Sequence, residues 1–236
     1  MRRSEGGVAV DDAGKEIVGH LQTVTGERER RAADPALGRF VAAVKTYQHQ
    51  RFAHTYADLM AQPRYAAATR FFLDDLYGAA DYSERDRQFM RIVPAMVRLF
   101  PSDIVSTVRH LGALHALSEK LDSLMGAALA TVDITGVRYT TAWCTSSAAE
   151  REHQISLMLR VGSDLDRYTR KPLLRQSLRL MRGPANAAGL GDLQRFLELG
   201  FDTFREMRGA EEFLATIGQR ERALAAALFS GAPGPD

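Results

Sequence analysis

The chain contains a single cysteine, no long apolar run and no marked excess of either charge. Because Cys144 has no second cysteine to pair with among the 236 residues, neither an internal disulfide nor a cysteine-only metal site can form, as is typical of a reducing compartment. The apolar stretches are only a few residues long, far short of the roughly 20 that cross a bilayer as a helix. A net charge of +2 gives no general attraction to nucleic acid or to an acidic membrane. We therefore expect a cytoplasmic protein with no membrane span and no nucleic-acid partner.

Motifs of catalysis and export are missing as well. The chain has no phosphate-binding glycine loop, no dinucleotide-binding glycine motif, no HExxH zinc motif and no nucleophile elbow. Charged residues between positions 11 and 16 interrupt the apolar core that a signal peptide requires. These absences favour a binding protein over an enzyme.

Helical periodicity, by contrast, runs along most of the chain. Hydrophobic residues make up 45% and charged residues 25%, close to the average of folded globular proteins. Apolar residues recur every three or four positions, as on one face of a helix, in segments near 34–61, 63–77, 83–100, 103–130, 147–161, 172–182, 191–208 and 210–229. We predict an all-α, single-domain helical bundle of about seven to nine helices.

The ends of this bundle and some of its boundaries can also be predicted. Residues 1–33 are polar and charged and should form a flexible arm with one short helix near 12–24, residues 34–230 should form the helical domain, and residues 231–236 should be a loose tail. The segment 131–145 is rich in β-branched and aromatic residues, which favours a short hairpin or an irregular excursion.

Glycine, proline and capping residues set further boundaries. Ser147 with Glu150 three positions later forms the pattern of a capping box and should start a helix. Gly162 should end that helix, and the pair Gly183-Pro184 should end the next one.

The first candidate site lies on the helix predicted at 103–130. His115 and Asp122 fall on its apolar face, with Glu119 at the edge. These side chains could bind a divalent metal, act as acid and base, or present the imidazole to a haem iron. The run 110–118 resembles the proximal helix of globins, which implies haem. The alternative is a core histidine bonded to a neighbouring helix, with Asp122 paired to an arginine.

The second candidate site lies on the helix that follows Asp34. Its apolar face turns polar after Val44, and Arg51 could clamp a carboxylate or phosphate there, with His54 and Tyr47 at the flanks. The alternative is that this polar row faces solvent.

Two weaker patterns complete the candidates. Asp74-Asp75 and Glu150-x-x-His153 could contribute to a di-metal site, or could be ordinary surface and capping residues. A basic patch could grip phosphates or an acidic partner, or could be the solvated face of an amphipathic helix; it comprises Arg167, Arg170, Lys171, Arg175, Arg179 and Arg182.

Several segments together resemble a family of uncharacterised bacterial all-helical proteins. The residues that carry the resemblance are QRFAHTYADLM (50–60), FFLDDLYG (71–78), RDRQF (85–89) and RIVP (91–94). The resemblance extends to about residue 222 and implies no activity. We therefore predict a helical module that binds a partner protein or a small ligand in a groove between helices, with a homodimer as one form of partnership. The competing class is a haem- or metal-dependent protein that uses His115 with Glu119 or Asp122.

Overall fold

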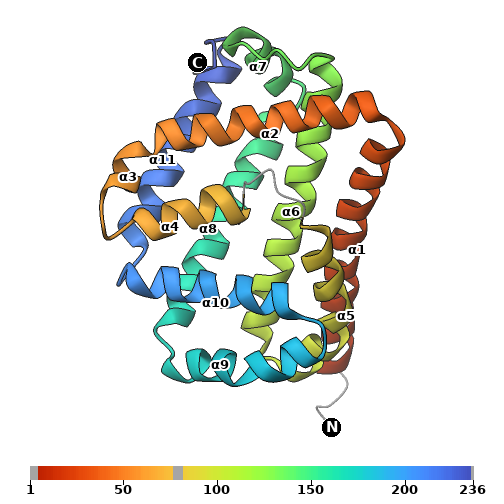
Figure 1. The fold of residues 1–236 in the computed structure, drawn as a ribbon, viewed down its shortest axis with the longest axis vertical. Helices are drawn as coiled ribbons and strands as arrows, with labels where there is room; N and C mark the ends of the chain where they lie inside the picture. The colour runs from red at the N-terminus through yellow and green to blue at the C-terminus, as the bar shows by residue number, and fades with distance from the viewer. Residues whose placement is uncertain (1–4, 77–81, 235–236) are drawn as a thin grey trace.

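The computed structural model describes residues 5–76 and 82–234, apart from the side chains of residues 5–11, 75, 76 and 172. Every regular element in these ranges is helical, which confirms the all-α prediction (Figure 1). The described ranges hold eleven α-helices and one π-helical turn, rather than seven to nine helices. In chain order they are α1 (Glu5–Ala33), α2 (Pro35–Thr55), α3 (Ala57–Ala61), α4 (Ala66–Phe71), η1 (Phe72–Leu76), α5 (Ser83–Leu99), α6 (Ser102–Leu129), α7 (Gly136–Trp143), α8 (Ala148–Thr169), α9 (Pro172–Ala187), α10 (Gly191–Glu206) and α11 (Glu211–Phe229).

The N-terminal segment is one long helix, whereas we expected an arm with a single short helix. α1 spans 29 residues and lies beside α6 along most of its length (Figure 1). Ile17, Leu21 and Val24 are buried, and their spacing of four and three residues puts them on one face of α1. Ile17 and Leu21 join residues of α5 and α6 in one apolar cluster. Burial of this stripe explains why the segment is helical throughout.

Side-chain caps start two of the long helices. Asp34 accepts hydrogen bonds from the N–H groups of Ala36 and Leu37 at the start of α2. Ser147 and Glu150 form the expected capping box at the start of α8. The helix predicted at 103–130 agrees with α6 to within one residue at each end.

Two predicted helix ends are wrong. Gly162 lies inside α8, where a Cβ atom would come within 2.6 Å of Leu214 Cδ2, so this glycine allows α8 and α11 to approach each other. Gly183 and Pro184 lie inside α9, which continues to Ala187.

The segment 131–145 and the tail also differ from expectation. Residues 136–143 form the helix α7, whose Tyr139 and Trp143 are buried, so packing overrides the β-type composition. The described part of the tail is attached to α7, because Thr140 Oγ1 donates to the carbonyl of Ala232 at 2.8 Å and the N–H of Gly234 donates to the carbonyl of Gly136 at 2.9 Å. The end of the helix predicted at 63–77 lies outside the described residues.

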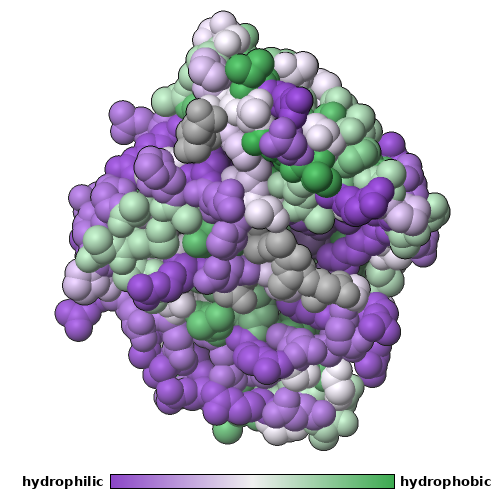
Figure 2. Space-filling model, turned by 45° about the horizontal axis from the view of Figure 1, so that its top comes forward, coloured by the Kyte–Doolittle hydropathy of each residue, from purple (hydrophilic) through white to green (hydrophobic). Residues whose placement is uncertain are grey.

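The apolar core has three parts. One lies between α1, α5 and α6; a second joins α2, α6, α7 and α11; the largest fills the space between α2, α3, α4, α8, α10 and α11. Hydrophilic residues cover most of the face seen in Figure 2, with apolar residues in smaller patches between them. None of the described helices is both long enough and apolar enough to span a membrane.

Candidate functional site

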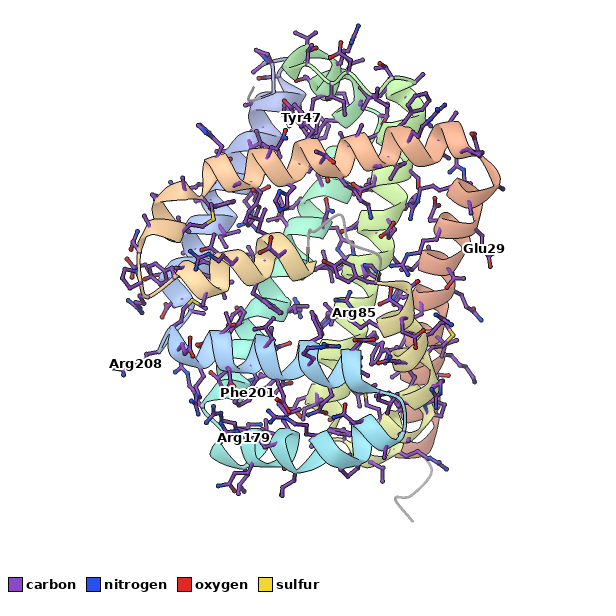
Figure 3. The ribbon with its side chains drawn as sticks, viewed as in Figure 1. Glu29, Tyr47, Arg85, Arg179, Phe201 and Arg208 are labelled. Atoms are coloured by element: carbon purple, nitrogen blue, oxygen red, sulfur yellow. The ribbon has the colours of Figure 1, made fainter. Side chains whose placement is uncertain are left out.

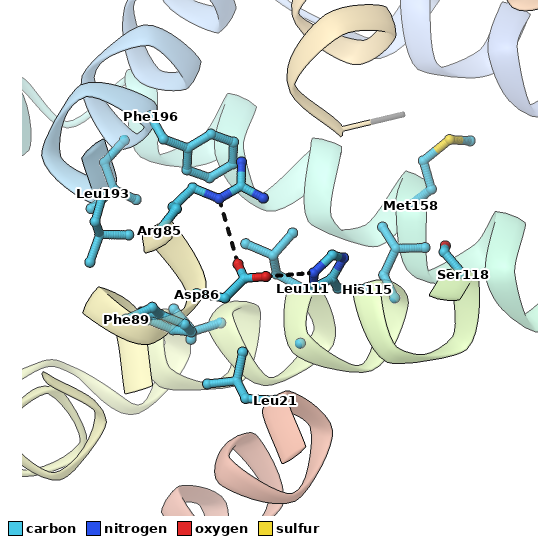
Figure 4. A pocket seen from close by; sticks show the side chains of 14 residues that line it. Leu21, Arg85, Asp86, Phe89, Leu111, His115, Ser118, Met158, Leu193 and Phe196 are labelled. Atoms are coloured by element: carbon cyan, nitrogen blue, oxygen red, sulfur yellow. Dashed lines mark hydrogen bonds and ion pairs between the residues drawn. The ribbon is translucent and has the colours of Figure 1, made fainter. Parts of the chain in front are cut away.

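A cavity of about 100 Å³ lies among α1, α5, α6, α8 and α10 (Figure 4). Its wall is mostly apolar and includes Leu21, Phe89, Leu111, Met158 and Phe196. Four polar side chains also line it, namely Arg85, Asp86, His115 and Ser118. An apolar cavity with a few convergent polar groups is the usual form of a site for a small molecule.

Asp86 is the centre of the polar end of this cavity. Its carboxylate lies 3.0 Å from His115 Nε2 and 2.8 Å from Arg28 Nη2. Arg85 Nε is 3.6 Å from the other carboxylate oxygen, and Figure 4 shows Asp86 between Arg85 and His115. Because an ionised carboxylate only accepts hydrogen bonds, Nε2 of His115 carries the proton and donates it. The other ring nitrogen, Nδ1, is then the acceptor of the neutral ring.

Three helices position this cluster. Arg28 comes one turn after Val24 on α1, so it continues the buried stripe of that helix. Asp86 stands in the first turn of α5, where a negative charge is favourable at the helix N-terminus. The guanidinium of Arg85 lies 4.2 Å from the centre of the Tyr82 ring and 4.4 Å from that of Phe196, which fixes its orientation. Figure 3 shows Arg85 in the interior between α5 and α10.

The electrostatic environment keeps Asp86 ionised. Burial alone would raise the pKa of this carboxyl, but the hydrogen bond from His115 and the positive charges of Arg85 and Arg28 lower the pKa below its ordinary value. Asp86 therefore holds a negative charge at neutral pH and can orient His115.

We expect Asp86 to make the stability of the protein depend on acid pH. Its pKa is lower in the folded chain than in the unfolded chain, so its contribution is complete above the unfolded value of about 3.9 and is lost as the pH falls through the folded value. Urea unfolding between pH 5 and pH 2 should show a smaller loss of stability in Asp86→Asn than in the native chain. Asp12→Asn, which removes an exposed carboxylate of α1, should keep the native pH dependence. An unchanged slope in Asp86→Asn would contradict this assignment.

The other two candidates on α6 have partners of their own. Glu119 is buried and accepts from Arg31 Nη2 at 2.5 Å and from Lys45 Nζ at 2.8 Å. Asp122 is also buried, and Lys45 Nζ lies 3.8 Å away. The described ranges contain no group of three or more His, Cys, Asp or Glu side chains that could hold a metal ion. His115 bonds to α5 through Asp86, whereas the residue that lies near Asp122 is a lysine rather than the arginine of the alternative interpretation.

The pKa values of Glu119 and Asp122 shift in opposite directions although one turn of α6 separates them. Burial raises the pKa of Asp122, and the negative charge of Glu119 adds to this effect. For Glu119 the effect of burial is outweighed by Lys45 and Arg31, which lower the pKa. Lys45 and Arg31 thus stabilise the ionised form of Glu119 more than that of Asp122.

The residues of the second candidate site are not brought together as one clamp. Arg51 is buried, and its Nη1 lies 2.5 Å from Glu221 Oε1, which also accepts from the hydroxyl of Tyr56 at 2.8 Å. The carboxylate that Arg51 meets therefore belongs to α11 of the same chain. His54 is exposed, while Tyr47 stacks on Tyr139 with ring centres 4.5 Å apart.

The basic patch is largely neutralised by acidic neighbours. Ion pairs join Arg167 to Asp164, Arg170 to Asp166, Lys171 to Asp103, Arg175 to Asp202 and Arg182 to Glu198. Among the described residues no ion-pair partner is found for Arg179, which lies on α9 at the edge of the molecule (Figure 3). Five of the six cations thus have an acidic neighbour, and Arg179 has none among the described residues.

Asp74 and Glu150 of the predicted di-metal pattern contact other side chains instead of one another. Asp74 is exposed and lies 3.4 Å from His49 Nε2, and the side chain of Asp75 is outside the described part. Glu150 completes the capping box of α8 and binds Lys120 at 3.2 Å, while His153 is exposed.

Sequence reasoning missed Arg28 and Asp86. Asp86 was not among the candidate residues, and Arg28 fell within the predicted N-terminal arm. One signal could have found Arg28: together with Arg31 it continues the apolar positions 17, 21 and 24 of α1 at the same spacing, which indicates arginines on a buried face. No local signal links either residue to His115, because the contacts bridge three separate helices.

The family comparison gives a match over most of the chain. A family model described as a domain of unknown function (DUF8198) matches residues 27–235. Neither the curated proteins nor the solved structures give a match.

Proposed function

Since the chain belongs to this domain family of unknown function, no activity comes with its relatives, and we propose from the cavity itself that the protein binds a small, mostly apolar molecule bearing one hydroxyl group. The observation that carries the proposal is an apolar cavity that ends on the Asp86 and His115 pair. This assignment develops the binding module that the sequence indicated and places its ligand between α1, α5, α6, α8 and α10.

The volume of the cavity limits the size of the ligand. Pockets for drug-sized ligands measure about 300–1,000 Å³, and an engineered apolar cavity of about 150 Å³ binds benzene. At about 100 Å³, the cavity suits a short alcohol or a single aromatic ring rather than a cofactor such as haem.

The polar end determines which group the ligand carries. His115 donates from Nε2 to Asp86, and no described residue donates to its Nδ1. A hydroxyl group of the ligand can donate to Nδ1, whereas the apolar wall accommodates the rest of the molecule. Phenol combines these features and serves as the probe, with benzene as its counterpart that lacks the hydroxyl.

The test compares phenol and benzene binding in the native chain and in His115→Phe. We expect both compounds to raise Tm in a saturable way, and phenol to bind the native chain more tightly. His115→Phe should weaken phenol binding by about tenfold, the value of one hydrogen bond, and should leave benzene binding unchanged. His153→Phe, which alters an exposed histidine of α8, is the matched control. Absence of saturable binding of both compounds would refute the cavity as the site, and equal phenol affinity in His115→Phe would refute the role of His115.

A further inference from the structure

A second cavity, of about 30 Å³, lies where α2, α7, α8 and α11 meet. Two arginines line it, Arg51 from α2 and Arg151 from α8, together with Trp143 from α7 and Glu221 from α11. Met158 borders both cavities, but Asp86 and His115 do not line this one, so its polar groups differ from those of the site proposed above.

Arg151 is a buried cation without a carboxylate partner. Only 2% of its surface is exposed, and no described carboxylate lies within ion-pair distance of it. Its guanidinium lies 3.7 Å from the centre of the Trp143 ring. Its donors reach only neutral groups, Ser146 Oγ at 2.9 Å, Gln154 Oε1 at 3.2 Å and Met125 Sδ at 3.1 Å. Buried charges in proteins are normally paired, so this guanidinium calls for a nearby anion.

The acidic groups in the neighbourhood do not fully compensate the positive charge of Arg151. Glu221 is engaged by Arg51 Nη1 and by the hydroxyl of Tyr56, so its negative charge compensates Arg51. Burial lowers the pKa of Arg151, and the more distant acidic groups of Tyr139, Asp122 and Glu150 oppose this effect only in part. An arginine nevertheless stays protonated in a protein, and its charge must be stabilised in place.

Two further N–H groups at the cavity have no partner among the described residues. Arg51 Nε and Trp143 Nε1 are both buried and unbonded, and both residues line the cavity. Each group can only donate a hydrogen bond. The hydroxyl of Tyr139, whose ring centre lies 5.9 Å from that of Trp143, is likewise buried and unbonded. Unused donors beside an uncompensated cation are the chemistry of an anion site.

We propose that this cavity binds one small monovalent anion, such as a halide or formate, between Arg51, Trp143 and Arg151. A water molecule needs about 10–15 Å³, so 30 Å³ is enough for a single small anion and too little for a phosphate ester. The bound anion accepts from Trp143 Nε1 and Arg51 Nε and supplies the negative charge that Arg151 lacks. It thereby holds α2, α7 and α8 together from within.

The single tryptophan of the chain gives a specific way to detect this anion. Bromide quenches indole fluorescence on contact, and Trp143 is only 5% exposed, so collisions from solution are largely excluded. With the native chain at constant ionic strength in methanesulfonate, we expect bromide to quench emission in a saturable way. Chloride, added without a heavy-atom effect, should reverse the quenching by competition. Competition by formate then shows whether carboxylates share the site.

The thermal stability of the native chain gives a second measure that needs no variant. Above its dissociation constant, chloride replacing methanesulfonate at constant ionic strength should raise Tm by about 3–5 °C for each tenfold increase in concentration. Arg151→Met keeps much of the side-chain volume and removes the charge, so it should abolish both the saturable quenching and the chloride effect. Arg179→Met removes one exposed charge of α9 and should leave both unchanged.

The proposal fails if bromide quenching of the native chain is linear and Tm does not respond to chloride, because water alone then occupies the cavity. It also fails if Arg151→Met folds and still binds bromide saturably. Should Arg151→Met not fold, the two measurements on the native chain decide the outcome.

Discussion

Glu119→Gln should lower the free energy of unfolding at pH 7 by about 3–5 kcal/mol, the usual cost of removing one partner of a buried ion pair. The Glu119 side chain is 6% exposed and accepts from Arg31 and Lys45, which are 12% and 21% exposed. Without the carboxylate, two cations remain in the interior between α1, α2 and α6 with much weaker compensation. Urea unfolding followed by circular dichroism measures the change.

Asp122→Asn is the matched control, because it removes a buried carboxylate one turn away on the same helix. Burial raises the pKa of Asp122, so the stability that depends on its protonation is present below the unfolded pKa and is lost as the pH rises through the folded pKa. Removing this charge should leave stability at pH 7 unchanged or increased. Equal destabilisation by the two substitutions would show that Glu119 is not the preferred partner of the cations.

Glu221→Met should also lower the free energy of unfolding by about 3–5 kcal/mol, because it leaves Arg51 without its carboxylate partner in the core. The Arg51 and Glu221 side chains are 7% and 12% exposed, so water cannot replace the lost contact. The double substitution Arg51→Met with Glu221→Met should recover most of the loss, since apolar side chains of similar volume often substitute for a buried pair at little cost.

A double-mutant cycle in urea separates this interpretation from simple disruption of packing. If the double variant is less stable than Glu221→Met alone, the damage comes from altered packing rather than from an unpaired arginine. Arg222→Met with Glu152→Met is the control pair, because that ion pair between α8 and α11 is half exposed and its coupling should be below about 1 kcal/mol.

The long regular helices could be predicted from the sequence because their signals are local. α6 has apolar residues at helical spacing along 28 residues, and α8 starts at a capping box. Gly162 was misread because a glycine that ends a helix and one that lets two helices approach look alike in the sequence. Only the position of Leu214, supplied by α11, distinguishes the two.

The sites were less predictable because their contacts join distant segments. His115 was identified from its place on an apolar face, but its partner Asp86 and the arginine that pairs with Asp86, Arg28, come from other helices. The buried state of Arg51 follows from its place after Val41 and Val44 on the inner face of α2, whereas the identity of its partner Glu221 does not. No sequence signal indicated that Arg151 is buried, since an arginine near the start of an amphipathic helix is usually solvated.

The pairing of α1 with α6 has a consequence for how the chain folds during synthesis. The two helices lie side by side, but α2 to α5 come between them in the sequence, so their contact has a high contact order. At about 5–20 residues per second, the ribosome needs roughly 5–20 s to proceed from the end of α1 to the end of α6. Until both α5 and α6 have been made, the buried stripe of α1 lacks part of the surface against which it packs, so we expect its apolar residues to be exposed on the nascent chain.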